Sequence, residues 1–121
     1  TLKFPPGSFT DGVQSALERL KAEGYNVVSA RNTFQEGAIY KGVNCNVISP
    51  EGQVFELQFH TEASFEMNYV THGDYEILRN PAASLEDRRD AFDRIKEAAG
   101  QLTNPPGVET IGTIQPNPIR P

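Results

Sequence analysis

The sequence predicts an α+β fold, in which a small, mainly antiparallel sheet with a central hairpin packs on helices. Three observations support this prediction. Residues 9–23 and 84–100 have apolar side chains at helical spacing. Residues 25–31, 38–48 and 53–60 are rich in β-branched and aromatic side chains, and the last two alternate apolar with polar residues. The segment SPEGQ between those two strands is short enough to form a hairpin.

Composition and charge exclude several classes of protein. The chain has 121 residues, which favours one domain over two, and 37% of them are hydrophobic. Its formal net charge of -5 argues against sequence-independent binding of DNA or RNA, which needs a basic surface. No apolar run approaches the roughly 18 residues of a membrane span. We therefore expect no nucleic-acid partner and no membrane partner, whereas a nucleotide could still bind in a locally basic pocket.

Cysteine and histidine are scarce. A single cysteine, Cys45, excludes an internal disulfide and a cysteine-rich metal cluster. The two histidines are His60 and His72, and without paired cysteines they do not predict a structural zinc site.

Local patterns define the order of the elements. Helix 9–23 has an apolar stripe that consists of Val13, Ala16, Leu17 and Leu20. Strand 25–31 follows, and NTFQEG is a loop before strand 38–48. A helix over 62–79 is expected after strand 53–60, and NPAA ends it. The last helix, 84–100, begins with Ser84 in the style of a capping box.

A change of composition divides the chain into a domain at 1–104 and an extended tail at 105–121. The segment after Leu102 holds five of the nine prolines, so it cannot sustain a helix or an inner strand. It still has apolar residues at intervals of three, namely Val108, Ile111 and Ile114. A tail that lies over the domain and a linker to another segment both remain open.

The hairpin has one register that separates apolar from polar residues. With Pro50, Glu51 and Gly52 as the loop, Ser49 lies opposite Gln53. The apolar pairs are then Val43 with Phe59, Cys45 with Leu57, and Val47 with Phe55, and we expect them to face the helices together with Leu17 and Leu20. The polar pairs are Gly42 with His60, Asn44 with Gln58, and Asn46 with Glu56. A slip by one residue would mix the two sets, which supports this register.

The polar face of the hairpin is the candidate functional surface. It gathers Tyr40, Asn44, Asn46, Glu56, Gln58 and His60. The helix at 62–79 follows directly and has His72, Tyr75, Glu76 and Arg79 at helical spacing. One face of an antiparallel sheet can also simply face water, so a solvated surface and a binding surface both remain open at this point.

The segment YKGVNCNVISPEGQVFELQFHT, followed by HGDYE, resembles the second half of the RelA/SpoT-type synthetase domain. That family transfers pyrophosphate from ATP to the 3′-hydroxyl of a guanine nucleotide and makes (p)ppGpp. Its members have a Tyr-x-Ser-[Ile/Leu]-His strand, a turn, a Glu-[Ile/Val]-Gln-[Ile/Leu]-Arg-Thr strand, and a helix with His and Tyr. GVQSALERLKAEGYNVV is similar to the family's preceding helix and strand, so the resemblance spans residues 2–80. ELQFHT and YKGVN are most similar to toxin modules of bacterial and phage proteins. The resemblance implies a nucleotidyltransferase-like synthetase half domain.

The resemblance assigns roles to residues of the polar face. Tyr40 matches the tyrosine that stacks on the acceptor base. Glu56 matches the catalytic glutamate, which binds Mg²⁺ and activates the attacking hydroxyl. Gln58 would help to hold the acceptor. The other residues implied in substrate binding are Asn44, His60, Lys41, His72, Tyr75 and Arg79.

Two substitutions reduce the fixed positive charge that the family places near the phosphates. Asn44 stands where the family has His, and His60 stands where it has Arg. Lys41 and Arg79 are candidates to replace part of that charge, although alternation places Lys41 on the other face.

The family's ATP-binding part, with an Arg-x-Lys strand and an Asp that shares the magnesium, has no counterpart in these residues. The resemblance is therefore to the acceptor-side half, with "LKF" as the end of the preceding strand. It implies Mg²⁺ with ATP as donor, purine nucleotides as partners, and either a separate N-terminal half or an immunity or host protein as a further partner. It implies a location in the bacterial cytoplasm, or delivery into a target cell for a secreted toxin.

Two other functions remain open. An ADP-ribosyltransferase-type toxin also uses a strand glutamate, but it needs an Arg and a Ser-Thr-Ser-like strand, for which Arg31 and Thr33 are the only candidates. A non-catalytic binding or structural module, such as an accessory domain of a phage head or an effector, would use the same polar face without chemistry.

Overall fold

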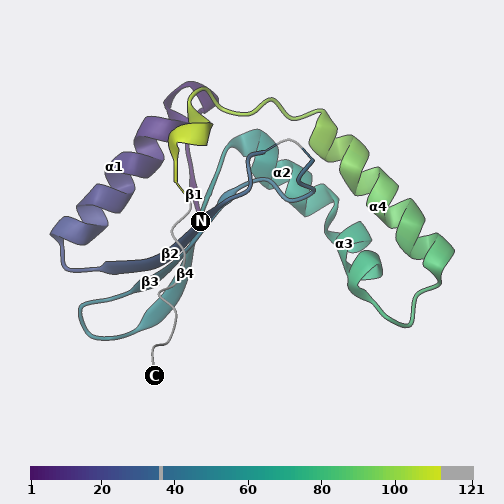
Figure 1. The fold of residues 1–121 in the computed structure, drawn as a ribbon, viewed down its shortest axis with the longest axis horizontal. Helices are drawn as coiled ribbons and strands as arrows, with labels where there is room; N and C mark the ends of the chain where they lie inside the picture. Colours follow the sequence, from purple (N-terminus) through teal and green to yellow (C-terminus); the bar gives the residue numbers. More distant parts are fainter. Residues whose placement is uncertain (36, 113–121) are drawn as a thin grey trace.

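The computed structural model describes residues 1–35 and 37–112 and confirms the α+β fold (Figure 1). Its elements, in chain order, are β1 (Leu2–Lys3), η1 (Pro6–Ser8), α1 (Phe9–Ala22), β2 (Asn26–Asn32), β3 (Val43–Ile48), β4 (Val54–His60), α2 (Glu62–Val70), α3 (His72–Arg79), α4 (Leu85–Gly100) and η2 (Val108–Thr110). None of the helices in this part of the chain combines the length and apolar character that crossing a membrane requires.

The four strands form one sheet in the order β1-β4-β3-β2. β2, β3 and β4 pair antiparallel, and β1 pairs parallel with β4, with Leu2 opposite Phe59 and Lys3 opposite His60. The expected strand at "LKF" is therefore present at the edge of the sheet. Figure 1 shows α1 and η2 together on one side of the sheet, whereas α2, α3 and α4 lie beyond the end of β4.

The hairpin has the predicted register, from Val43 opposite Phe59 to Val47 opposite Phe55. Its loop closes with hydrogen bonds from the Ser49 backbone N–H to the Gln53 carbonyl at 2.8 Å and from the Gln53 N–H to the Ser49 hydroxyl at 3.0 Å. Gly52 has φ 90°, a conformation that other residues rarely adopt. The turn chemistry and the separation of apolar from polar residues thus select the same pairing.

The apolar face of the hairpin lies in the core only in part. Val43, Cys45, Val47 and Phe59 are at most 1% exposed, as expected, and burial raises the pKa of the Cys45 thiol to about 11. Leu57, Leu17 and Leu20 are only half-buried at the edge of this core. Phe55, expected in the core, is 38% exposed and makes an edge-to-face contact with Tyr25. Contacts of α1 with the sheet are mainly with β2, so the apolar face of β4 near the loop remains partly open.

Two predicted elements are different in the structure. The single helix expected over 62–79 is two helices, which meet at Thr71. The Thr71 hydroxyl donates to the Met67 carbonyl at 2.8 Å, a bond to the preceding turn that is known to bend helices. The strand expected over 38–48 begins only at Val43, because β2 ends opposite that residue and leaves 38–42 without a continuous partner.

The segment after α4 returns to the core near α1. Val108 and Ile111 are 2% and 5% exposed and belong to the main hydrophobic cluster. The Asn32 side-chain amide donates to the carbonyls of both residues, at 2.9 and 3.1 Å. Of the three tail residues singled out in the sequence, Ile114 lies outside the described residues.

Candidate functional site

The polar face of β3 and β4 presents a paired carboxylate and amide. Glu56 and Gln58 are on the same side of β4, and Gln58 Nε2 donates to Glu56 Oε1 at 2.7 Å. Asn44 lies opposite Gln58 and Asn46 lies opposite Glu56, as predicted. Glu56 is exposed, so this carboxylate is accessible from solvent.

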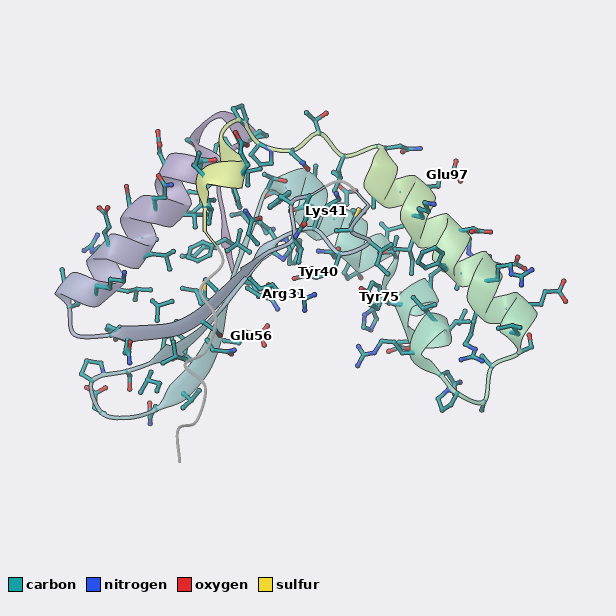
Figure 2. All side chains as sticks on the ribbon, viewed as in Figure 1. Arg31, Tyr40, Lys41, Glu56, Tyr75 and Glu97 are labelled. Carbon is teal, nitrogen blue, oxygen red and sulfur yellow. The ribbon has the colours of Figure 1, made fainter. Side chains whose placement is uncertain are left out.

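A β-bulge brings an arginine to the same face. The pairing of β2 with β3 shifts between Val27 and Ser29, after which Arg31 lies opposite Asn44. Before the bulge Val27 faces the core, and without the extra residue strict alternation would put Arg31 on that face too. Figure 2 shows Arg31 on the side of the sheet that Glu56 occupies. Sequence reasoning named Arg31 only for the alternative function, because alternation alone does not reveal a bulge.

Tyr40 connects the loop before β3 to the polar face. Its hydroxyl donates to Asn44 Oδ1 at 3.1 Å and lies 3.3 Å from His60 Nε2. Burial is the largest cause that raises the pKa of the Tyr40 phenol; the hydrogen bond to Asn44 opposes it, and the Glu56 charge adds to it. Tyr40 is therefore held by hydrogen bonds while part of its ring stays accessible.

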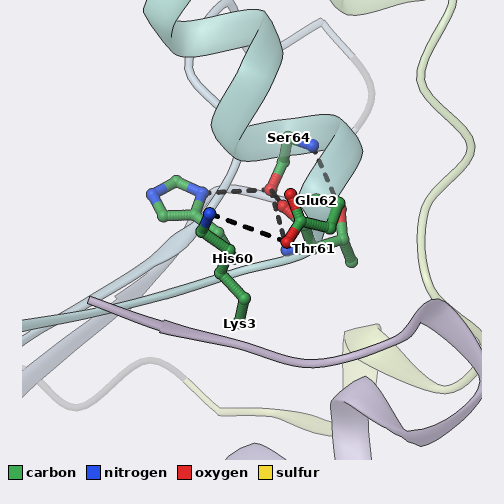
Figure 3. Close-up of polar contacts among 5 residues, drawn as sticks. All are labelled: Lys3, His60, Thr61, Glu62 and Ser64. Carbon is green, nitrogen blue, oxygen red and sulfur yellow. Dashed lines mark hydrogen bonds and ion pairs between the residues drawn. The ribbon is translucent and has the colours of Figure 1, made fainter.

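His60 is buried beneath Tyr40, with 2% of its surface exposed. Its Nδ1 lies 3.0 Å from the Ser64 hydroxyl (Figure 3). Gly42 fits against the ring, because a Cβ there would lie 2.7 Å from His60 Cε1. Burial is the largest cause that lowers the pKa of His60, the positive charge of Lys3 lowers it further, and a hydrogen bond to the Lys41 backbone opposes these effects. The surroundings of the imidazole therefore favour its neutral form.

Ser64 belongs to a capping box at the start of α2 that sequence reasoning missed. The Thr61 side chain accepts from the Ser64 backbone N–H at 3.1 Å, and the Ser64 hydroxyl accepts from the Thr61 N–H at 3.0 Å. The usual signature has Glu or Gln at this position, so a serine there gives little sequence signal. The box ties the N-terminus of α2 directly to the residue at the end of β4.

A cavity of about 640 Å³ lies between the polar face and α2. It is rich in aromatic and amide groups, and its lining residues are Tyr40, Gln58, His60, Phe65, Asn68, Tyr69, His72 and Gly73. The Asn68 amide donates to the Lys41 carbonyl at 3.2 Å, which fixes α2 against the loop before β3. Flat, partly exposed rings beside amides suit a ligand with an aromatic base.

The three candidates on α3 lie at different distances from this cavity. His72 lines it and pairs with Glu76, with 3.0 Å between Nε2 and Oε1. Tyr75 is half-buried and projects from α3 toward Tyr40 and Arg31 (Figure 2). Arg79 is exposed at the last residue of α3 and does not line the cavity.

Lys41 lies away from the cavity that Tyr40 lines. It is 5% exposed, and its Nζ donates to the Gln35 carbonyl. It lines a different cavity of about 470 Å³ beside Lys96 and Asn104. The structure therefore separates the Lys41 side chain from the other predicted site residues, whereas Arg31 is an exposed cation on the polar face.

The Glu56 carboxylate on this face suits a metal ion only where substrate phosphates and water supply further ligands. In residues 1–35 and 37–112, no three His, Cys, Asp or Glu side chains lie close enough together to hold a metal ion. Mg²⁺ commonly binds through one or two carboxylates together with substrate phosphates and water. Glu56, with amide oxygens of Asn46 and Gln58 on the same face, fits that mode of binding.

One solved structure with this fold is a small alarmone synthetase of Bacillus subtilis bound to its product pppGpp. Its TM-score with this chain is 0.54 at 20% sequence identity, and the match covers 76% of this chain and 50% of that enzyme. No protein-family model matches the sequence, and no curated protein sequence does. The chain therefore has the fold of part of an alarmone synthetase and spans about half the length of that enzyme.

Proposed function

We propose that this chain forms the acceptor and catalytic face of a nucleotide 3′-pyrophosphokinase, which transfers pyrophosphate from ATP to a purine nucleotide. The observation that supports this proposal is the Glu56–Gln58 pair, with its exposed carboxylate, on the same sheet face as Tyr40, on a fold similar to that of an alarmone synthetase. A carboxylate that can accept a proton and an aromatic platform for a base are the two parts that such an acceptor site needs.

In this proposal Glu56 is the catalytic residue. The acceptor's 3′-oxygen forms a bond to the β-phosphorus of ATP, the bond between that phosphorus and the α-phosphate oxygen breaks, and AMP leaves. The hydroxyl proton goes to a Glu56 carboxylate oxygen, and the Gln58 amide orients that carboxylate through its 2.7 Å hydrogen bond. Glu56 would also hold Mg²⁺, which would supply neutralisation of the charge that develops on the transferred group.

The acceptor nucleotide would be held by the groups around the cavity. Its base stacks on Tyr40, and Gln58 and Asn44 hydrogen-bond the sugar edge. Arg31 contributes the fixed positive charge for acceptor phosphates, since it lies opposite Asn44 on this face. His72 and Tyr75 close the side formed by the helices. Lys41 and Arg79, the earlier candidates for phosphate contacts, have no part in this arrangement.

The donor half of the site would come from elsewhere. Because the chain spans about half the length of the synthetase it resembles in fold, we propose that the ATP-binding residues belong to another segment or another chain. Pyrophosphate transfer depends on positioning and charge neutralisation, so this half would bind an acceptor but transfer slowly without its counterpart.

The experiment that tests the proposal uses the longest natural protein that contains this segment. It is incubated with ATP, Mg²⁺ and either GDP, GTP or ADP, and the products are separated by ion-exchange chromatography. A 3′-pyrophosphorylated nucleotide and equimolar AMP, both lost in Glu56→Gln, are expected. Absence of both from every mixture would remove the synthetase proposal.

The same assay separates the other two functions. Thr33, one of the two candidates for an ADP-ribosyltransferase, is buried, and its hydroxyl donates to the Gly42 carbonyl at 2.9 Å. Consumption of NAD would nevertheless reveal that activity. A non-catalytic module would consume neither NAD nor ATP.

A further inference from the structure

A chain of side-chain hydrogen bonds runs beneath the cavity from α2 to β3. It connects Ser64 to His60 at 3.0 Å, His60 to Tyr40 at 3.3 Å, and Tyr40 to Asn44 at 3.1 Å. Ser64 and His60 are 0% and 2% exposed, so water does not compete for these bonds. Figure 3 shows the buried end of this chain, where His60 Nδ1 faces the Ser64 hydroxyl.

The donor and acceptor in the two bonds of His60 depend on its tautomer. The Tyr40 hydroxyl donates to Asn44 Oδ1, and the Ser64 hydroxyl donates to the Thr61 carbonyl at 3.2 Å while its oxygen accepts from the Thr61 backbone N–H. His60 can therefore donate from Nε2 to the Tyr40 oxygen or from Nδ1 to the Ser64 oxygen. In either tautomer each ring nitrogen lies within hydrogen-bond distance of a hydroxyl group, so the ring connects Ser64 on α2 to Tyr40.

We propose that Ser64 and His60 are positioning residues, which hold the Tyr40 ring as the stacking platform for the acceptor base. This inference rests on the proposed function, because it assigns Tyr40 to the base. His60 borders the cavity with only 2% of its surface exposed, and its two ring nitrogens lie within hydrogen-bond distance of Ser64 and Tyr40. The imidazole therefore connects α2 to the Tyr40 hydroxyl, so the position of this helix helps to determine where the hydroxyl lies.

Packing also restricts the imidazole. Gly42 lies against one side of the ring, and the Phe65 ring meets it edge-to-face at a centroid distance of 5.9 Å. The Lys3 ammonium lies 4.1 Å from the centroid of the Phe65 ring. It also lies 3.6 Å from the Glu62 carboxylate, an ion pair that connects β1 to α2 (Figure 3). A ring confined in this way has one orientation in which both nitrogens are paired.

The test compares Ser64→Ala with Thr61→Ala in the chain of 121 residues. Each variant removes one half of the capping box, but only Ser64→Ala breaks the bond to His60. GDP and ADP are the probes, and their dissociation constants are measured by calorimetry. Ser64→Ala is expected to weaken binding about three- to tenfold, as for one lost neutral hydrogen bond, while Thr61→Ala leaves it unchanged.

A double-mutant cycle separates positioning from loss of structure. Tyr40→Phe keeps the ring and removes the hydroxyl that ends the chain. If Ser64 acts through that hydroxyl, adding Ser64→Ala to Tyr40→Phe causes no further loss of affinity. Additive losses, or equal losses in Ser64→Ala and Thr61→Ala, would overturn the inference.

A readout without nucleotide keeps this inference distinct from the proposed function. In NMR spectra Ser64→Ala should shift the Tyr40 ring resonances more than Thr61→Ala does. No difference between the two variants would overturn the inference. If neither GDP nor ADP binds the wild type, the proposed function fails, and these spectra still decide whether Ser64 and His60 position Tyr40.

Discussion

Glu56 and Gln58 lie two residues apart on β4 and are joined by a hydrogen bond of 2.7 Å between Oε1 and Nε2. A strand places such residues on the same face, and the exposed carboxylate is oriented by the amide instead of rotating freely. The pair lies on the same face as Tyr40 and Arg31, so groups able to accept a proton, stack on a base and contact a phosphate are all in one place (Figure 2).

Glu56→Gln is expected to abolish pyrophosphate transfer by the complete protein without altering its fold. An amide cannot accept the hydroxyl proton, and positioned acid–base catalysis typically contributes about 10²- to 10⁴-fold. Because Glu56 is exposed, its replacement should change the free energy of unfolding by less than about 0.5 kcal/mol. Chromatography of products and thermal denaturation check the two parts, and wild-type turnover in this variant would exclude Glu56 as the base.

Tyr40→Ala is expected to raise the KM for the acceptor roughly 5- to 100-fold, which corresponds to the loss of one base–aromatic stack. Stacking stabilises the bound ground state and the transition state alike, so kcat should change little. Initial rates at varied acceptor concentration provide the measurement. A fall in kcat at unchanged KM would show that Tyr40 contributes to chemistry instead of binding.

Arg31→Ala is expected to weaken acceptor binding roughly tenfold and to reduce its dependence on salt, because one charge-assisted contact to phosphate is lost. Arg31→Lys should restore only part of the affinity, since lysine keeps the charge but not the planar fork. Arg19→Ala is the matched control, because Arg19 is an exposed arginine on α1 and pairs with Glu23 at 3.5 Å. Equal effects of the two alanine variants would point to net charge alone.

Phe59 and Phe55 should differ sharply in their contribution to stability, although both lie on the apolar face of β4. Phe59 is fully buried and Phe55 is 38% exposed. Phe59→Ala is therefore expected to reduce the free energy of unfolding by about 3–5 kcal/mol, and Phe55→Ala by about 1–2 kcal/mol. Urea denaturation measures both. Similar costs would mean that the open side of β4 is covered in solution.

Much of the fold could be predicted from the sequence because its strongest signals are local and agree with each other. Gly52 determines the turn, and only one register keeps Val43, Cys45 and Val47 on a single face. The polar pairs Asn44–Gln58 and Asn46–Glu56 follow from that register without further information. The part of the candidate site that lies on the hairpin could be predicted for the same reason.

The rest of the site depends on features that alternation does not encode. The bulge after Val27 turns Arg31 to the polar face, and Thr71 divides the helix expected over 62–79. Ser64 has no signature of its own, because its role depends on Thr61 and on where α2 meets His60. Lys41 was a candidate on chemistry alone, and its burial beside Gln35 depends on a loop that the sequence does not define.

The stability of the chain should fall as the pH drops below about 6.5, because His60 must gain a proton in a buried site. Burial and the positive charge of Lys3 lower the pKa of folded His60, whereas in the unfolded chain it titrates near the ordinary value of about 6.5. Between these two pKa values the unfolded chain binds more protons, so the free energy of unfolding decreases as the pH decreases. Above about pH 6.5 His60 is neutral in both the folded and the unfolded chain, so it no longer reduces the free energy of unfolding.

Replacement of each histidine assigns this pH dependence. His60→Gln should flatten the decrease between pH 7.5 and 5, measured by urea denaturation at each pH. His72→Gln should leave it in place, because His72 is exposed whereas His60 is buried. If the slope persists in His60→Gln, carboxylates must cause it. Loss of the slope in His60→Gln alone would show that the neutral imidazole between Ser64 and Tyr40 stabilises the fold.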